Sequence, residues 1–320
     1  MICRTPRPAG VICSTTSAVP VLREILPDLG RRTLVMGVLN VTPDSFSDGG
    51  RFQSVESALE HAHQMAREGA DLLDIGGEST RPGAVPVSAD EEISRVVPII
   101  ARIRDEIRLP ISLDTTKADV AAAGVGAGAQ IINDISAGTM DDRMLSIVAG
   151  LRVPLTLMHL PVVPQKMGWS QPPATGGIAS HADVVEAVVA FLAERIEAAA
   201  AAGIPRENLL IDPGFGFGKS VRQNLDLLRR LGEIKRRLGD DLPLLLGTSR
   251  KSTIARVLGP AADAEDPQRI AGTAATVALG IANSADIVRV HDVGFMARVV
   301  RISDAVVRGE PAEQGEGIGV

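Results

Sequence analysis

The chain has 320 residues, with 33 basic and 39 acidic side chains and a formal net charge of −6. Neither sign gathers into a long block, so this balance gives no support to a nucleic-acid partner or a membrane-surface partner. No uncharged apolar run is long enough to span a bilayer and the only cysteines, Cys3 and Cys13, lie outside every periodic segment, so we expect a cytoplasmic protein without a disulfide framework or a cysteine-based metal site.

Eight short β-branched runs recur along the chain, and each is followed by a polar turn and a longer amphipathic segment. The runs are LVMGVLN from Leu34, LLDIGG from Leu72, ISLDTT from Ile111, IINDIS from Ile131, PLTLMH from Pro154, LLIDPG from Leu209, LLLGTS from Leu244 and IVRVHD from Ile287. Repeated strand–helix units predict a parallel sheet, and eight of them favour closure into a barrel because closure covers both sheet edges. The predicted fold class is α/β, a single (β/α)8 TIM barrel.

The amphipathic segments between these runs predict helices around one domain. Helical periodicity covers residues 54–68, 90–108, 182–202, 224–238 and 270–283. Residues 1–30 are expected to form a loosely ordered leader, residues 31–308 the barrel domain, and residues 309–320 a flexible tail. The alternative is an open Rossmann-like sheet. The sequence disfavours it because no strand is followed by a GxGxxG turn, and the Gly-rich stretch at Gly124 ends a helix instead of starting one.

Polar residues end all eight predicted strands. They are Asn40, Asp74, Asp114, Asn133 with Asp134, His159, Asp212, Lys251 just past its strand, and Arg289 with His291 and Asp292. Any one of them has a structural explanation, since Asn and Asp often form turns or cap helices at strand–helix junctions. That explanation is poor for all eight strands together, because catalytic groups of α/β barrels lie at the C-terminal ends of the strands. The sequence therefore predicts an active site at this rim.

The carboxylates among these residues predict a pocket for a polar heterocycle. Asp74, Asp114 and Asp212 would repel one another in one mouth unless they meet hydrogen-bond donors. Together with the amide of Asn133 they complement the N–H-rich edge of an aminopyrimidine-type ring. Lys251 either reaches this mouth or remains in solvent. A metal cage of protein side chains is the competing interpretation, which the dispersal of these residues over separate strands and the lack of an HxxxH or HxH pair disfavour.

Basic and hydroxyl side chains predict an anion site beside this pocket. Arg289 and His291 are two residues apart, which places both side chains on one face of an extended strand. The loops NVTPDSFSDGG and GGESTRPGA add an amide, hydroxyls and a guanidinium. This set suits a pyrophosphate with Mg²⁺, which takes few protein ligands beside phosphate oxygens and water; the alternative is that both loops are surface turns.

The string DPGFGFGKS lacks P-loop spacing, and its Phe215 and Phe217 are expected to contact the ligand.

In this order, the strand ends and loops resemble dihydropteroate synthase, a pterin-binding family of folate biosynthesis. The matching strings are GVLNVTPDSFSDGG, GADLLDIGGESTRPGA, SLDTTKADV, IINDISAG, LMH, LIDPGFGFGK, GTSRKS and RVHDV, which run from about Leu34 to Asp292. The resemblance implies a transferase that condenses 6-hydroxymethyl-7,8-dihydropterin pyrophosphate with 4-aminobenzoate, giving 7,8-dihydropteroate and pyrophosphate, with Mg²⁺ on the phosphates. It also implies a homodimer, which the apolar faces of residues 270–283 and 295–307 would allow.

The resemblance implies roles for individual residues as well. The pterin would be bound by Asp114, Asn133, Met158, Asp212, Phe217 and Lys251. The pyrophosphate would be bound by Thr80, Arg81, Arg289 and His291, and the 4-aminobenzoate by Thr42, Pro43, Phe46, Arg81 and Ser249. Asn40 would bind Mg²⁺, and the catalytic residues would be Asp114, Lys251, Arg289 and His291.

One segment departs from the family pattern, and two other functions share parts of these motifs. After LMH the family continues with Met, a polar residue and Gly before Pro, whereas this chain reads LPVVPQKM. A methyltetrahydrofolate-dependent methyltransferase would share the pterin-binding carboxylates but would have no need of the TPDSFSDGG and SRKS loops. A catalytically silent pterin-binding paralogue is disfavoured by the presence of all the basic and hydroxyl side chains of the site, namely Thr80, Arg81, Lys251, Arg289 and His291.

Overall fold

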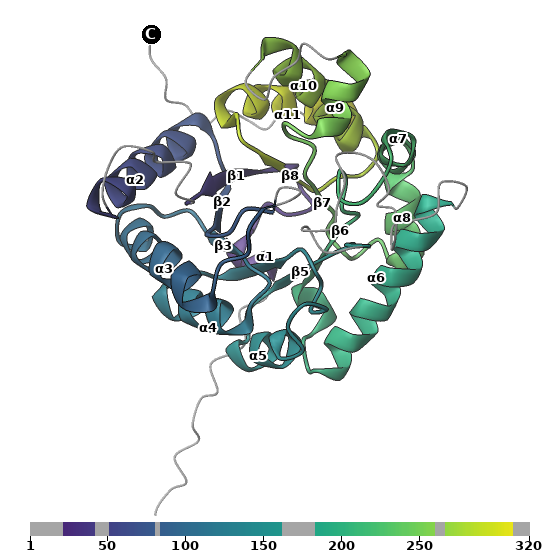
Figure 1. The fold of residues 1–320 in the computed structure, drawn as a ribbon. Helices are drawn as coiled ribbons and strands as arrows, with labels where there is room; N and C mark the ends of the chain where they lie inside the picture. The colour runs from purple at the N-terminus through teal and green to yellow at the C-terminus, as the bar shows by residue number, and fades with distance from the viewer. Residues whose placement is uncertain (1–21, 42–50, 81–83, 162–182, 260–265, 310–320) are drawn as a thin grey trace, which may run out of the picture.

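Eight parallel strands form the centre of the molecule (Figure 1). The computed structural model describes residues 22–41, 51–80, 84–161, 183–259 and 266–309. The strands are β1 (Leu34–Asn40), β2 (Leu72–Gly76), β3 (Ile111–Asp114), β4 (Ile131–Asp134), β5 (Leu155–Met158), β6 (Leu209–Asp212), β7 (Leu245–Leu246) and β8 (Ile287–Val290). Their order is β6-β5-β4-β3-β2-β1-β8-β7, and a bridge joins Ile211 of β6 to Leu244, the residue before β7. The predicted eight-stranded barrel is confirmed.

Helices surround the strands (Figure 1). They are α1 (Leu22–Ile25), α2 (Arg51–Glu68), α3 (Ala89–Glu106), α4 (Ala118–Ala127), α5 (Met144–Leu151), α6 (Val184–Ala201), the 3₁₀ helix η3 (Arg206–Asn208), α7 (Val221–Arg229), α8 (Leu231–Leu238), α9 (Ser252–Leu258), α10 (Pro267–Ala282) and α11 (Val293–Arg308). Local signals start them: Asp183 caps α6, and Ser220 with Gln223 forms a capping box on α7. Within the described ranges, no helix combines the length and apolarity needed to cross a membrane.

The pattern that predicts one helix over residues 224–238 forms two. α7 ends at Arg229 and α8 begins at Leu231, because the backbone of Arg230 leaves the helical region (φ −114°, ψ 21°). The Arg230 guanidinium contacts Asp183 at the start of α6 (2.8 Å) and Glu233 in α8 (2.7 Å). The break places α7 against α10 and α8 against α6.

Side chains alternate between the two faces of the strands, as expected for parallel strands buried on both faces. The outward set packs under the helices in the main core and comprises Val35, Leu39, Leu73, Ile75, Ile111, Leu113, Ile132, Leu155, Leu157, Leu209, Ile211, Leu246, Val288 and Val290. The inward set near the strand starts forms a second cluster of Leu34, Met36, Leu72, Ile131, Leu210, Leu245 and Ile287. Two positions further along four of these strands, the inward residues are Asp74, Asn133, Asp212 and Arg289. The barrel interior is therefore apolar at one end and polar at the other.

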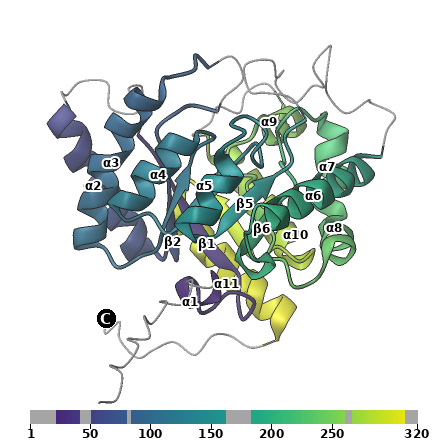
Figure 2. The ribbon, with the colours of Figure 1, turned by 90° about the horizontal axis from the view of Figure 1, so that it is seen from below.

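The apolar end of the barrel is closed by α1 and the turn after it. Leu22, Leu26 and Leu29 are at most 2% exposed and belong to the cluster inside the barrel, and the Leu22 N–H donates to Asn208 Oδ1 at 2.9 Å. Figure 2 shows α1 below the strands at this end. The expectation of a loosely ordered leader over residues 1–30 is therefore wrong for residues 22–30. Residues 1–21 and 310–320 lie outside the described part of the chain.

The closure by α1 predicts that Leu26→Ala destabilises the fold without changing catalysis. Removing a fully buried leucine side chain costs about 2–5 kcal/mol, because it leaves a cavity as well as removing apolar contacts. Urea unfolding measures the loss, and steady-state kinetics below the unfolding transition should give unchanged kcat and KM. Altered kinetics at full stability would contradict a purely structural role for this helix.

Candidate active site

A buried carboxylate, Asp74, organises the polar end of the barrel. Asp74 accepts hydrogen bonds from Ser112 Oγ at 2.6 Å, Asn133 Nδ2 at 3.1 Å and Arg289 Nε at 2.6 Å. The strand register brings these groups together, since Asp74 and Ser112 are partners across β2 and β3. Three donors compensate for the loss of water around a fully buried charge. Asp74 therefore holds the Asn133 amide and the Arg289 guanidinium in place from inside the barrel. The expectation that it faces a ligand is wrong.

Asp114, at the end of β3, shares the same guanidinium. Arg289 Nη2 donates to Asp114 Oδ2 at 2.9 Å, so that Arg289 bridges two carboxylates and leaves Nη1 outside both ion pairs. Burial raises the pKa of Asp114 to about 7; Arg289 opposes this rise and Asp74 adds to it. Burial works against the charge of Arg289, but the two carboxylates outweigh it and raise its pKa. The predicted catalytic pair of Asp114 and Arg289 is thus in direct contact.

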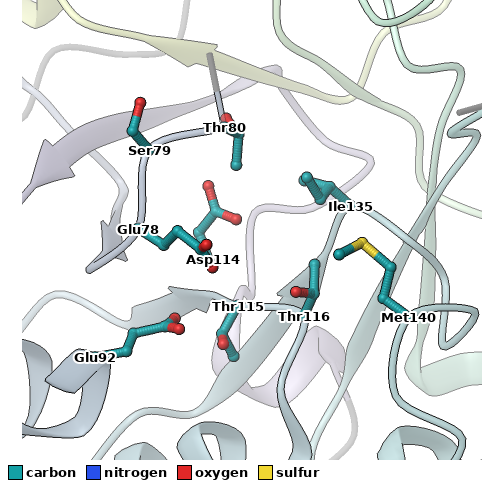
Figure 3. A pocket seen from close by; sticks show the side chains of 9 residues that line it. All are labelled: Glu78, Ser79, Thr80, Glu92, Asp114, Thr115, Thr116, Ile135 and Met140. Carbon is teal, nitrogen blue, oxygen red and sulfur yellow. The ribbon is translucent and has the colours of Figure 1, made fainter. Parts of the chain in front are cut away.

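Asp114 also lines a pocket at the rim. The pocket contains about 350 Å³ of empty space, part of which is open to solvent. Figure 3 shows the Asp114 carboxylate between Thr80, from the loop after β2, and Thr115, from the loop after β3. Ile135 and Met140 form the apolar side of the pocket. A residue predicted to bind the pyrophosphate, Thr80, therefore faces the same space as a residue predicted to bind the pterin.

Lys117, which is not among the predicted site residues, links the loops after β2 and β3 at this pocket. Lys117 forms ion pairs with Glu78, which precedes Thr80, and with the buried Glu92 of α3. Glu78 also accepts the backbone N–H of Val87 at 3.2 Å. Burial raises the pKa of Glu92, and Lys117 opposes the rise. The signal in the sequence was the lysine three residues after Asp114, within SLDTTK.

A small apolar cluster lies at the ends of the neighbouring strands and consists of Ile135, Met158 and Leu160, with Phe217 packed against it. It offers an apolar surface to a flat ring, as ligand sites usually do. Phe215, by contrast, is 1% exposed and belongs to the main core, so the expectation that it contacts the ligand is wrong. Positive φ angles at Gly214 and Gly216 interrupt the extended backbone here, so the side chains of this loop do not follow strand alternation.

Lys251 reaches into the mouth beside this cluster. Its Nζ lies 3.8 Å from the centroid of the Phe217 ring, a cation–π contact. Burial lowers the pKa of Lys251 to about 8; Arg289 adds to the decrease and Asp212 opposes it. Asp212 accepts the Gly214 N–H at 2.6 Å. Its pKa is raised to about 6 by burial, which this hydrogen bond and Lys251 oppose. The predicted pterin residues Asp212, Phe217 and Lys251 therefore form one side of the mouth.

His291, the residue after β8, is oriented by Ser249, which lies three residues after the neighbouring strand β7. Its Nδ1 lies 3.0 Å from Ser249 Oγ, which also accepts the backbone N–H of His291 at 3.2 Å. Ser249 is buried, so it acts here as a support for the imidazole. The next residue, Arg250, forms an ion pair with Asp292 at 2.6 Å and ties the two strand ends together.

Replacing Ser249 by Ala is expected to lower kcat/KM for the pyrophosphate substrate about tenfold, the effect of one lost hydrogen bond that orients His291. Thermal stability should change little. Ser146→Ala removes a comparable hydroxyl, bonded to the Arg143 carbonyl on an exposed helix start, and is the matched control. Equal kinetics of both variants and the wild type would exclude an orienting role for Ser249.

Two strand-end residues serve the fold instead of the mouth. His159 is 3% exposed and packs edge-on against Phe191, with ring centroids 5.1 Å apart. Burial lowers its pKa well below the usual value, so the ring is neutral. Asp134 accepts hydrogen bonds from the N–H and hydroxyl of Ser136 and forms a turn. His159 and Asp134 are therefore polar strand ends with a structural role, one in packing and one in a turn.

Some predicted residues lie outside the described residues. They are Thr42, Pro43, Phe46 and Arg81. The divergent loop after His159 lies there too, over residues 162–182. Asn40 is described and is exposed at the end of β1. Among the residues that the structure describes, no group of three or more His, Cys, Asp or Glu side chains is arranged to hold a metal ion.

The barrel, its polar rim and the matched sequence define the class of protein. The family model of pterin binding enzymes matches residues 36–291, from β1 to the residue after β8. That stretch contains every contact described above between Asp74, Asp114 and Arg289. The class is therefore that of the pterin-binding enzymes.

Individual relatives narrow the class. The dihydropteroate synthase of Synechocystis sp. is 45% identical over 286 residues, which cover 89% of this chain and 94% of the relative. The structure of dihydropteroate synthase from Clostridium difficile in the presence of pteroic acid is 42% identical with a TM-score of 0.79, covering 88% and 99% of the two chains. That from Xanthomonas albilineans with 4-aminobenzoic acid is 45% identical with a TM-score of 0.76, covering 86% and 93%. The chain belongs to the dihydropteroate synthases, transferases of folate biosynthesis.

Proposed function

We propose that this chain condenses 6-hydroxymethyl-7,8-dihydropterin pyrophosphate with 4-aminobenzoate, giving 7,8-dihydropteroate and pyrophosphate. The observation that carries the proposal is the Arg289 bridge between Asp74 and Asp114, with N···O distances of 2.6 and 2.9 Å. It places a cation and a carboxylate at one mouth, and a pterin that bears a pyrophosphate arm requires both.

The pterin ring is bound by acceptors on several strands. Asp114, Asp212 and the amide oxygen of Asn133 accept hydrogen bonds from ring N–H groups, since the amide nitrogen of Asn133 already donates to Asp74. Lys251 donates to a ring acceptor, and Phe217 packs along the ring. Asp114 and Asp212 must be ionised to accept these hydrogen bonds. Arg289 and Lys251 favour the ionised form, because their positive charges oppose the rise in pKa that burial causes.

The reaction replaces a C–O bond by a C–N bond. The bond between the methylene carbon and the pyrophosphate breaks with its electron pair on oxygen, and Thr80, Arg289 and His291 stabilise the charge of the leaving group. The electron-rich dihydropterin stabilises the remaining methylene cation, and the Asp114 carboxylate adds to this stabilisation. The neutral amine of 4-aminobenzoate then attacks through its lone pair and releases a proton to water, so no strong base is required.

The rim residues fit a Mg²⁺ ion that is shared with the pyrophosphate. Asn40 Oδ1 and Asp114 Oδ2 converge on Gly76, lying 3.8 and 3.7 Å from the point where a Cβ of that residue would be. One exposed amide oxygen from Asn40, completed by phosphate oxygens and water, is the kind of ligand set that Mg²⁺ prefers. When bound, the ion neutralises charge on the pyrophosphate.

The test is to incubate the purified protein with dihydropterin pyrophosphate and Mg²⁺, with and without 4-aminobenzoate, and to measure dihydropteroate and pyrophosphate. Product that depends on 4-aminobenzoate is the expected result. Pterin binding without product would favour a silent paralogue. Methyl transfer from methyltetrahydrofolate, in place of condensation, would favour the methyltransferase alternative.

The same proposal includes a cytoplasmic homodimer. The exposed faces of α10 and α11, which pack against each other, carry Leu279, Phe295, Ile302, Val306 and Val307. Monomers seldom leave this many large apolar side chains exposed on adjoining helices. Sedimentation equilibrium measures the mass in solution. A monomer at micromolar concentration would contradict this part of the proposal.

A further inference from the structure

Lys219 is a fully buried lysine to which the reaction above assigns no role. Its Nζ donates to three backbone carbonyl oxygens, those of Gly214 at 2.7 Å, Phe217 at 3.2 Å and His159 at 3.3 Å. An ammonium group has three N–H donors, so these carbonyls use all of them. They belong to two segments, the end of β5 and the loop after β6, and the lysine holds these segments together.

The loop after β6 fits closely around this lysine and around Lys251. Gly214 has a φ of +68°, and a Cβ at this position would lie 2.1 Å from the His159 carbonyl oxygen. Gly216 has a φ of +84°, and a Cβ there would lie 2.9 Å from Lys251 Cδ. Only glycine allows this approach. The loop therefore contacts one lysine on its inner side and the other at the mouth.

A second buried group ties the same loop to the segment that carries Lys251. Asn224 Oδ1 accepts the Gly216 N–H at 2.7 Å, and its Nδ2 donates to the Lys219 carbonyl at 3.2 Å and to Thr253 Oγ1 at 3.0 Å. Thr253 lies two residues after Lys251, near the start of α9. Phe217, which stacks under Lys251, is thereby held from both sides.

We propose that Lys219 is a positioning residue for the pterin pocket: through the Gly214 and Phe217 carbonyls it holds the Phe217 ring against Lys251. The inference rests on the proposed function, which supplies the pterin as the substrate of this pocket. It predicts that damage to this support affects the pterin far more than 4-aminobenzoate, because the predicted 4-aminobenzoate contacts other than Ser249 are on the loops after β1 and β2.

Two variants test the proposal, each with a matched control at the far end of the barrel. Lys219→Met removes the ammonium, and Lys235→Met removes another largely buried lysine, paired with Asp286 at 2.6 Å. Thr253→Val removes the hydroxyl that accepts the hydrogen bond from Asn224 Nδ2 and should fold readily. Thr33→Val removes an equally buried hydroxyl that donates to Asp304 at 2.7 Å.

The readouts are KM for each substrate and the equilibrium binding of 6-hydroxymethylpterin, which does not need turnover. We expect Lys219→Met and Thr253→Val to raise the pterin KM and Kd by about tenfold to a hundredfold, as expected when a wall of a site shifts by an ångström or less. KM for 4-aminobenzoate should stay within about twofold of the wild type, and both controls should lose stability only.

The inference would be overturned if folded Lys219→Met and Thr253→Val had the wild-type Kd and KM for the pterin. It would also be overturned if KM rose equally for the pterin substrate and for 4-aminobenzoate. A wild-type protein that binds pterin but forms no dihydropteroate would overturn the proposed function and leave the binding comparison decisive for Lys219.

Discussion

Replacing Asp114 by Asn is expected to lower kcat/KM for the dihydropterin pyrophosphate by about 10²–10³-fold, the size of effect seen when one preorganised electrostatic group is lost. Asp114 lines the rim pocket with Thr80 and accepts a hydrogen bond from Arg289 at 2.9 Å. The amide keeps the shape of the side chain but removes the negative charge next to the developing cation. Steady-state kinetics with each substrate varied in turn measures the effect.

The same substitution should remove a pH dependence. Burial raises the pKa of Asp114 from 3.8 to about 7, so the folded state binds this proton more tightly than the unfolded state does. The contribution to stability is present below about pH 4 and is lost as the pH rises through about 7. Wild-type kcat/KM should therefore rise through about pH 7 as the carboxylate forms, and the variant should lack this rise. The stability of the variant relative to wild type should improve between pH 4 and 8.

Asp134→Asn is the control for this experiment. Asp134 is fully buried, and burial raises its pKa to about 6, but its partners are Ser136 and Gly138 in a turn. It should lose stability and keep its kinetics. If Asp114→Asn instead lost stability and kcat to a similar extent, Asp114 would be a structural residue and the catalytic assignment would fail.

The barrel could be predicted from the sequence because its strands obey a simple period. Leu72 and Asp74 on β2, or Ile287 and Arg289 on β8, show how an apolar residue near the strand start is followed two positions later by a polar one at the rim. The closure by α1 was missed, although Leu22, Leu26 and Leu29 have the spacing of an apolar helix face. Short helices give weak signals, and these three residues become a core only when the barrel is present.

The rim residues could be named from the sequence, but their partners could not. Arg289 meets Asp74 and Asp114 because the barrel closes between β1 and β8, which brings together residues more than 170 positions apart. Sequence spacing placed Arg289 and His291 on one strand face and said nothing of the carboxylates opposite. Phe215 and Phe217 also looked alike. The glycines between and beside them direct one ring into the core and the other to the mouth.

Replacing Arg289 by Met is expected to be the most damaging substitution at the site. Removing the cation leaves Asp74 as a fully buried carboxylate whose remaining donors, Ser112 and Asn133, are neutral, and breaking such a buried pair typically costs about 3–5 kcal/mol. Activity should fall at the same time, because the leaving group loses its guanidinium. Urea unfolding and the condensation assay measure the two losses. Arg237→Met, which breaks an exposed pair with Glu186, should change neither.

A double variant separates the buried charge from the chemistry. Adding Asp74→Asn to Arg289→Met removes the unpaired carboxylate while keeping a side chain that can still hydrogen-bond to Ser112 and Asn133. The double variant should therefore be more stable than Arg289→Met alone, giving a clear coupling energy between the two positions, and it should remain inactive. Additive stability losses would mean that Asp74 and Arg289 act independently. Recovered activity would mean that the Arg289 guanidinium is not needed for departure of the pyrophosphate. Its role would then be only to neutralise the carboxylates of Asp74 and Asp114.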